Sequence, residues 1–529
     1  MTLRTRRPRT RRPRTRRTRT PLAHPAGAAL TATALAVPLL LAGAGTAGAD
    51  PDPARRGAQL AARLVARSSA DDALDTLKAL QRIADRNGGT RAAGSPGHEE
   101  SARYVYEQAR RAGLKVSRQD FTYTFFEART QRLDVVSPQA EQVPVIAMTY
   151  SPSGPESGVK GELAVVPVSA ATGCAAADYP AGEFAGRIAL IRRGGCGFAV
   201  KQAAAAAAGA AGAIVYNTAD GDLNGTLGEP NAGVRIPVGG VSKAAGEALA
   251  AKAAAGPVDV DLDIRTFMEP RTTWNVLAET RGGDGNDTVF VGAHLDSVPA
   301  GPGVNDNGSG SAGILEVARN LGVRPVRNKV KFAWWSAEEF GLKGSEAYVK
   351  SLSEADRKKI RLYLNFDMIA SPNHAQFVYD GSGSTGGGAG PAGSAQIQRH
   401  ISDFLDGRGV PHEPVAFNGR SDYGPFIDAG IPAGGTDTGA EAVKSPAQQA
   451  RYGGTAGSAF DPCYHKACDD LNNLDRDAFG ENIAVIAHAV GTFAWDLGEL
   501  DRPATVVPQA DGGGAGGGLS ADHAHEVAA

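Results

Sequence analysis

After its first fifty residues the sequence contains no long apolar run. Its 68 glycines follow no Gly-x-y period, which excludes collagen, and no longer period indicates a solenoid. No segment after the N-terminal region is apolar over the length needed to cross a bilayer. Only four cysteines are present, enough for two disulfide bonds, and an oxidising compartment would preserve them.

Charge is divided unevenly along the chain, although its formal total is only −2. Residues 1–49 hold ten arginines and no acidic residue, so the remainder carries 45 basic and 57 acidic residues, a net charge of −12. This balance argues against a nucleic-acid-binding surface. With 42% hydrophobic and 21% charged residues, the chain is ordinary globular material.

The N-terminus has the composition of a secretory signal. A basic run at residues 4–19 precedes an apolar stretch at 26–41 and the small-residue site Ala47-Gly48-Ala49. We expect residues 1–49 to be a signal peptide cleaved after Ala49, giving a secreted, extracellular protein. The export route, Sec or twin-arginine, stays open, and the alternative is a basic arm for nucleic acid.

Strand and helix patterns alternate over most of the chain and predict an α/β fold. Helices are expected within 69–113, at 199–211, 309–321, 343–350 and 482–495, and strands at 119–126, 161–168, 187–191, 213–216, 275–280, 288–293, 329–335 and 361–366. We expect a mixed, mostly parallel central sheet with flanking helices, formed by residues 50–135 and 266–502. A mostly β domain at 136–265 interrupts it, and 503–529 form a Gly-rich disordered tail.

Polar residues with metal-binding side chains follow several of the predicted strands. In order along the chain they are His294, Asp296, Asp306, Glu338, Glu339, Asp367 and His465. Loops at the carboxyl ends of strands converge on one crevice in an open α/β sheet. Imidazole and carboxylate ligands brought together there suit zinc.

This order of residues resembles the M28 family of zinc aminopeptidases, in particular secreted bacterial members with two zinc ions. The match covers roughly residues 70–130 and 270–500. The resemblance implies one zinc on His294, Asp306 and Asp367, and a second on Asp306, Glu339 and His465, with Asp306 bridging. It also implies that Asp296 orients His294.

The resemblance assigns the catalytic roles to Glu338 and Tyr464. Two zinc ions activate a water for attack on the peptide bond. Glu338, beside the ligands, is expected to be the general base, and the Tyr464 phenol to steady the developing oxyanion. No His-Glu-x-x-His motif is present, which disfavours a single-zinc protease with its ligands on one helix.

The insertion resembles a protease-associated (PA) domain. The residues that carry this likeness lie at 173–179, 186–198 and 201–217. The resemblance implies a Cys174–Cys196 disulfide there and a Cys463–Cys468 disulfide around Tyr464 and His465. The alternative for the second pair is that a cysteine binds zinc. For the PA domain, control of access to the active site and a purely structural role both stay open.

Two residues are expected to contact the substrate. Arg420 matches the position that supports the substrate and the transition state, with an ordinary loop salt bridge as the alternative. Asp437 stands where Leu-preferring members carry an aromatic residue in the pocket for the N-terminal side chain. A carboxylate there favours N-terminal Lys or Arg. The alternative is that Asp437 turns away and braces its loop.

The sequence therefore predicts a secreted zinc aminopeptidase that removes N-terminal residues from peptides or proteins. We expect two Zn²⁺ per chain, no nucleic-acid partner, no stable membrane association and a monomer. Calcium binding is possible, but no residue pattern in the sequence supports it. One alternative is a glutaminyl-cyclase-like acyltransferase, which metal stoichiometry would distinguish. The other is a non-catalytic binding protein, against which the intact Glu338 and ligand set argue.

Overall fold

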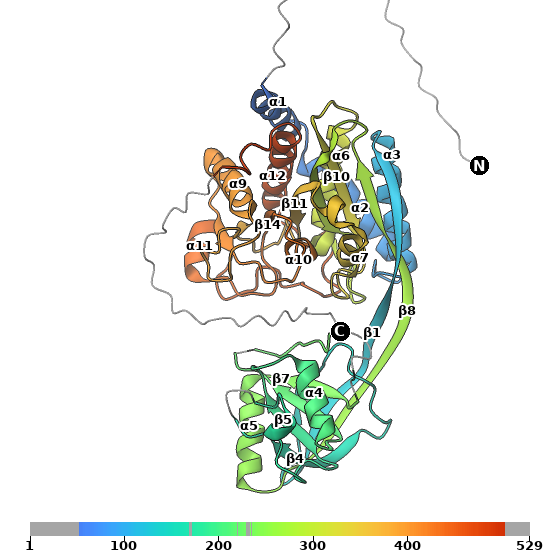
Figure 1. Ribbon diagram of the computed structural model, residues 1–529, viewed down its shortest axis with the longest axis vertical. Helices are drawn as coiled ribbons and strands as arrows, with labels where there is room; N and C mark the ends of the chain where they lie inside the picture. Colours follow the sequence, from blue (N-terminus) through green and yellow to red (C-terminus); the bar gives the residue numbers. More distant parts are fainter. Residues whose placement is uncertain (1–51, 169–171, 220, 229–232, 234, 503–529) are drawn as a thin grey trace, which may run out of the picture. The chain divides into compact units, whose positions relative to one another are not determined.

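The structure is a computed structural model that describes residues 52–168, 172–219, 221–228, 233 and 235–502 (Figure 1). The helices are α1 (Pro53–Val65), α2 (Ala70–Arg86), α3 (Pro96–Arg111), α4 (Phe198–Ala207), α5 (Lys243–Ala255), α6 (Gly310–Leu321), α7 (Lys343–Ser351), α8 (Glu354–Arg357), α9 (Ser394–Arg408), α10 (Gly424–Asp428), α11 (Pro446–Tyr452) and α12 (Arg476–Phe493). The expected signal peptide and Gly-rich tail lie outside the described residues.

The strands are β1 (Lys115–Ser137), β2 (Glu141–Val143), β3 (Ile146–Ala147), β4 (Val159–Val165), β5 (Ile188–Arg192), β6 (Gly212–Tyr216), β7 (Val238–Val241), β8 (Asp259–Glu279), β9 (Asp284–His294), β10 (Asn328–Trp335), β11 (Ile360–Phe366), β12 (Phe377–Tyr379), β13 (Glu413–Val415) and β14 (Ala433–Asp437). The larger sheet runs in the order β1-β8-β10-β9-β11-β14-β12-β13. Strands β10, β9, β11 and β14 are mutually parallel, and β8 and β12 pair antiparallel to this group. The sheet is therefore mixed and mostly parallel, which confirms the predicted fold class.

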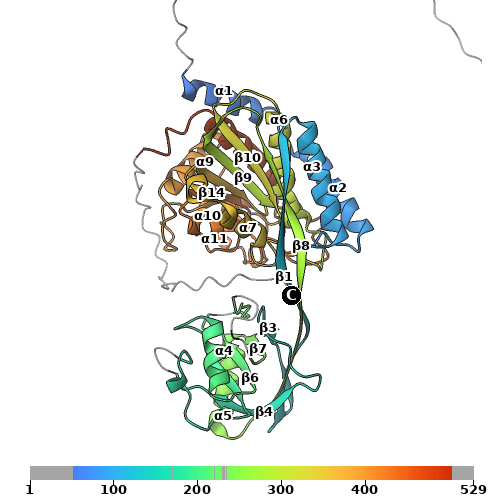
Figure 2. The same ribbon diagram turned by 45° about the vertical axis from the view of Figure 1, so that its right-hand side comes forward.

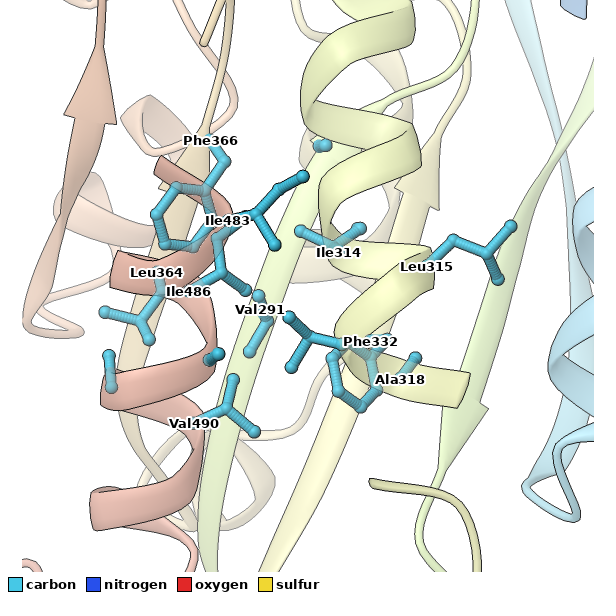
Figure 3. Close-up of a cluster of buried hydrophobic side chains, with 14 of the residues drawn as sticks. Val291, Ile314, Leu315, Ala318, Phe332, Leu364, Phe366, Ile483, Ile486 and Val490 are labelled. Atoms are coloured by element: carbon cyan, nitrogen blue, oxygen red, sulfur yellow. The ribbon is translucent and has the colours of Figure 1, made fainter. Parts of the chain in front are cut away.

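Side chains of the central strands alternate between two buried cores, because successive strand residues point to opposite faces. On one face, Val291, Phe332 and Leu364 pack against α6 and α12, as Figure 3 shows. On the other, Phe290 and Tyr363 pack with aromatic side chains of α7 and α10. Both faces are covered, so the strands read as continuous apolar runs. Each large apolar side chain buried this way contributes about 1.5–3 kcal/mol.

The helices on the first face begin where the sequence provides caps. The Ser69 hydroxyl accepts the Asp72 N–H at the start of α2, and the Asp475 carboxylate accepts two N–H groups at the start of α12. Contacts of α12 with α1, α6 and α9, and of α2 with α6, complete this layer. Within the described part of the chain, no helix combines the length and apolarity that a membrane span requires.

Two long antiparallel strands join the larger sheet to the inserted domain (Figure 2). Strand β1 has 23 residues and β8 has 21, and they pair from Lys115–Glu279 to Ser137–Asp259. One end of β8 pairs with β10, whereas its other end pairs with β4 of the insertion. In the insertion, β4, β5, β6 and β7 are parallel neighbours, flanked by α4 and α5. The predicted domain boundaries at residues 135 and 266 lie within β1 and β8, respectively. These boundaries stay a prediction.

The structure contains the helices and strands expected from the sequence, with altered lengths. The strand expected at 119–126 is the much longer β1, because β8 pairs with it along its length. The helix expected at 199–211 ends at Ala207, and Gly209 follows with a positive φ of 89°. Strands β7, β12, β13 and β14, with three to five residues each, are too short to show a periodic pattern.

Candidate active site

The expected ligands lie at one edge of the sheet. His294 is the last residue of β9, Glu338 and Glu339 follow β10, and Asp367 follows β11. These three strands are adjacent and parallel, so their carboxyl ends meet. Asp306 comes to the same place from the turn before α6, and His465 from the loop before α12.

The side chains form two groups that share Asp306. His294 Nε2 lies 3.3 Å from Asp306 Oδ1 and 3.3 Å from Asp367 Oδ1. His465 Nε2 lies 3.1 Å from Asp306 Oδ2 and 3.1 Å from Glu339 Oε2. Each triad has the spacing of a metal site, and the two carboxylate oxygens of Asp306 face different triads. This is the arrangement expected of a bridging carboxylate.

Neighbouring polar groups hold the ligands of the first triad. The Ser421 hydroxyl donates to Asp367 Oδ2 at 2.6 Å, and the other oxygen, Oδ1, has no hydrogen-bond partner. His294 Nδ1 lies 3.2 Å from the Asp296 carbonyl oxygen and 3.7 Å from its carboxylate. The carbonyl is therefore the nearer partner of the ring, and the carboxylate accepts the Glu338 N–H at 3.2 Å.

The cluster concentrates negative charge away from water. Burial raises the pKa of Glu339 to about 7 and that of Glu338 well above its usual range. Burial lowers the histidine pKa values, but the carboxylates of Asp367 and Glu339 outweigh it, and the pKa values of His294 and His465 are well raised. These four upward shifts favour added positive charge, which a bound cation would supply. Asp306 behaves differently: burial works to raise its pKa, but hydrogen bonds from His294 and His465 outweigh burial and hold the pKa below its usual range. Orphaned oxygens on Glu339 and Asp367 are available to a cation, and the mixed nitrogen and oxygen donor set fits zinc.

Glu338 lies beside the triads without belonging to either. Its Oε2 is 3.9 Å from His294 Nε2, and it lines the same cavity as Asp306, Glu339 and Asp367. Its raised pKa suits a group that accepts and releases a proton.

Tyr464 and Arg420 also line the cavity. An Arg420 N–H donates to the Tyr464 hydroxyl at 3.1 Å. The same guanidinium donates to the two carboxylate oxygens of Glu441, at 2.7 and 3.3 Å. The Tyr464 ring stacks on His465 with centroids 3.7 Å apart. Burial raises the phenol pKa well above its usual range, so the hydroxyl keeps its proton and can donate.

The cavity has a volume of about 220 Å³ and combines these polar side chains with apolar ones, among them Phe377, Val415 and Phe460. Asp437 lines it too, while its Oδ1 accepts the Gly439 N–H at 2.9 Å. Burial raises the pKa of Asp437 to about 7. Asp437 therefore lines the pocket and also holds its own loop in place, so features of both hypotheses, substrate contact and loop bracing, are present.

Left-handed backbone conformations gather at the site. Among the described residues, non-glycine positive φ values occur at Ala337, Met368 and His465, and also at Tyr150 and Leu342. The first two adjoin Glu338 and Asp367, and the third is itself an expected ligand. Each costs about 1–2 kcal/mol, which the surrounding contacts must offset.

Both disulfides implied by the resemblance are present. Cys463–Cys468 closes the short loop that carries Tyr464 and His465, and Cys174–Cys196 lies in the insertion. The cysteines beside His465 are therefore bonded to each other, which excludes the alternative of a thiolate ligand.

Comparison with known proteins agrees with this site. The family model "Peptidase family M28" matches residues 275–490, and "PA domain" matches 159–249. Leucine aminopeptidase 2 of Trichophyton rubrum is 45% identical over 417 residues, which cover 78% of this chain and 82% of that protein. The chain belongs to peptidase family M28. A probable leucine aminopeptidase 2 of Aspergillus oryzae is also 45% identical, over 415 residues covering 78% and 82% of the two chains.

Solved structures of aminopeptidases have the same fold. The aminopeptidase from Aneurinibacillus sp. strain AM-1 is 29% identical, with a TM-score of 0.66 over 81% of this chain and 95% of that chain. BSAP, a zinc aminopeptidase from Bacillus subtilis, is 25% identical, with a TM-score of 0.57 over 80% and 95%. This M28 protein is a zinc-dependent aminopeptidase, as the sequence predicted.

All the predicted site residues lie in or directly behind the cavity, but several supporting residues were not predicted. Ser421, Glu441, Asp469 and Arg91 each hold a site residue or the loop that carries one. Ser421 follows Arg420 directly, and Asp469 follows Cys468 directly. Adjacency to a recognised motif was the only signal of these two in the sequence.

The electrostatics predict how the metal-free M28 protein responds to pH. Glu339 keeps its proton up to about pH 7 in the folded protein, whereas it loses the proton near pH 4.5 in the unfolded chain. The raised pKa values of His294 and His465 likewise make the folded protein hold protons that the unfolded chain has lost. The folded state binds more protons, so stability falls as pH rises from about 5 to about 8. Zinc should raise the unfolding temperature more at the higher pH. Thermal unfolding of chelator-stripped and zinc-loaded protein measures this; a stripped protein that gains stability with pH would contradict it.

Proposed function

We propose that this M28 aminopeptidase holds two zinc ions per chain and hydrolyses the first peptide bond of peptides and proteins outside the cell. The observation that carries the proposal is the division of Asp306 between two triads, its Oδ1 facing His294 and its Oδ2 facing His465. Zinc in such sites supplies Lewis-acid activation of a water and of the peptide carbonyl. We take His294, Asp306 and Asp367 as ligands of one ion, and Asp306, Glu339 and His465 as ligands of the other.

Glu338 is the proposed general base. Its carboxylate takes a proton from the attacking water and later delivers it to the departing amine as the C–N bond breaks. Tyr464, held by Arg420, donates a hydrogen bond to the oxygen that gains negative charge. Glu338 and Asp367 both line the cavity, and we propose that their carboxylates also bind the free α-ammonium group of the substrate, which would favour action at N-termini.

We also propose that the protein is secreted and monomeric. The two disulfides support an oxidising compartment, and the basic and apolar composition of residues 1–49 supports a signal peptide. The aminopeptidase relatives and the intact Glu338 weigh against the acyltransferase and the non-catalytic alternatives.

Glu338→Gln tests the general base. The amide cannot accept and pass on a proton, so we expect kcat to fall by about 10²–10⁴-fold or more while zinc content stays at the wild-type level. The measurements are hydrolysis of aminoacyl-p-nitroanilides and zinc content by mass spectrometry. Glu354→Gln, at an exposed helix start, is the matched control. A near-normal rate for Glu338→Gln would remove this residue from the mechanism.

His465→Ala tests the number of metal ions. Because His465 belongs to only one triad, we expect its loss to lower the zinc content from two ions per chain to one and to remove most activity. Zinc is measured after dialysis against metal-free buffer. His412→Ala, which lies outside both triads, is the control and should keep two ions. Unchanged zinc content in His465→Ala would contradict the assignment of two ions per chain.

We also propose that Asp437 allows the apolar pocket to accept basic N-terminal side chains. Its carboxyl lines the pocket beside Phe377 and Phe460, where an ammonium or guanidinium would pair with it. The relatives are named leucine aminopeptidases, so the carboxylate would add to an apolar specificity that the pocket walls already provide.

Asp437→Asn tests this preference. We expect the ratio of kcat/KM for Lys- over Leu-p-nitroanilide to exceed one in the wild type and to fall about tenfold or more in the variant, because a charged pair becomes a neutral contact. Asp428→Asn, on the surface, should leave the ratio unchanged. A wild-type ratio well below one, or the same ratio in Asp437→Asn, would eliminate the basic preference.

A further inference from the structure

The backbone between His294 and Asp306 carries a proposed ligand at each end but has little regular structure of its own. Residues 295–303 belong to no helix or strand, and all of them except 299 and 300 are buried. A buried backbone must find hydrogen-bond partners outside itself. Two charged residues from distant parts of the chain, Asp469 and Arg91, provide several of them.

Asp469 accepts three consecutive N–H groups of this segment. Its carbonyl oxygen accepts the Val304 N–H at 3.0 Å. Its carboxylate oxygens accept the next two, Asn305 N–H on Oδ1 at 2.8 Å and Asp306 N–H on Oδ2 at 2.9 Å. Asp469 itself is only 2% exposed. Burial and the nearby Asp461 carboxylate raise the pKa of Asp469 to about 8, whereas the two backbone N–H groups on its oxygens favour the ionised form. Hydrogen bonds from backbone N–H groups to an ionised carboxylate are stronger than neutral ones.

Arg91 binds the carbonyl groups of the same segment. Its guanidinium donates to the carbonyl oxygens of Leu295, Pro302 and Gly303, at 2.7 Å for Pro302 and 2.5 Å for Gly303. The side chain is completely buried. A guanidinium keeps its charge and presents its N–H groups as a rigid fork, so it fixes these carbonyls in position.

Asp469 also belongs to the segment that carries His465. It follows Cys468 of the disulfide-closed loop, and at the other end of that loop Asp461 Oδ2 accepts the Asn305 side-chain N–H at 2.7 Å. Asn473 bridges the two carboxylates, donating to Asp461 at 2.9 and 3.0 Å and to Asp469 at 3.1 Å. Two ligand-bearing segments, far apart in sequence, are thereby tied directly to each other.

We infer that Asp469 is a positioning residue that sets the Asp306 carboxylate relative to His465, and that Arg91 fixes the same loop from its other side. This inference rests on the proposed role of Asp306 and His465 as metal ligands. Asp469 is not itself one of the residues that line the cavity, and its hydrogen bond to Asp306 is made to the backbone N–H, so its effect on the metals would pass through the backbone of Asp306.

Asp469→Asn is the substitution that tests the role of the Asp469 carboxylate most specifically. An amide has the same shape but only one acceptor oxygen, so its NH₂ group would face one of the two backbone N–H groups. We expect zinc affinity to fall about 10- to 100-fold, as is typical when a partner behind the ligands is lost. KM should stay near the wild-type value while kcat falls at limiting zinc. The visible absorption spectrum of cobalt(II)-substituted protein should change as well, because it reports ligand geometry.

The experiment strips the full-length enzyme of metal and titrates it with zinc against a chromophoric chelator. Asp470→Asn is the matched control, because among the described residues the neighbouring Asp470 carboxylate accepts a hydrogen bond only from the nearby Asn472 N–H. Wild-type affinity and cobalt spectrum in Asp469→Asn would overturn the inference. If Asp469→Asn fails to fold, Arg91→Lys decides: its single ammonium cannot reproduce the fork, and it should weaken zinc binding at least about tenfold. A wild type that binds no zinc would instead overturn the proposed function.

Discussion

Four carboxylates and two imidazole rings lie buried within reach of one another around Asp306, and the surrounding structure has to support that concentration of charge. Buried carboxylates cannot all ionise without cations, and burial raises the pKa values of Glu338 and Glu339 accordingly. Zinc ions shared through the two Asp306 oxygens would balance this charge. Metal binding and the native arrangement of these loops would therefore be coupled.

The fold supports the cluster at two levels. Adjacent parallel strands bring His294, the Glu338-Glu339 pair and Asp367 to one edge, and two dry cores on either side keep the strands fixed. The remaining ligands come from loops, which no strand pairing orders. There buried charged side chains, with Asp469 and Arg91 foremost, take the place of secondary structure by binding loop backbone.

Much of this arrangement could be predicted from the sequence, for identifiable reasons. His294, Glu338 and Asp367 each follow an apolar strand, so their convergence follows from the fold class. The partners of the loops were not predictable, because Asp469 and Arg91 act on backbone atoms, which leave no sequence pattern. Asp437 shows the same limit: its presence in the pocket was expected from the resemblance, but its bond to the Gly439 N–H depends on the loop conformation.

The central claim is that two zinc ions share Asp306. Anomalous X-ray scattering at the zinc edge from crystals of the zinc-loaded enzyme tests it most directly. Two ions that share Asp306 should give two peaks roughly 3.5–4 Å apart, one beside Asp306 Oδ1 with His294 and Asp367, the other beside Oδ2 with Glu339 and His465. A single peak in fully loaded crystals, or a second peak away from Asp306, would contradict it.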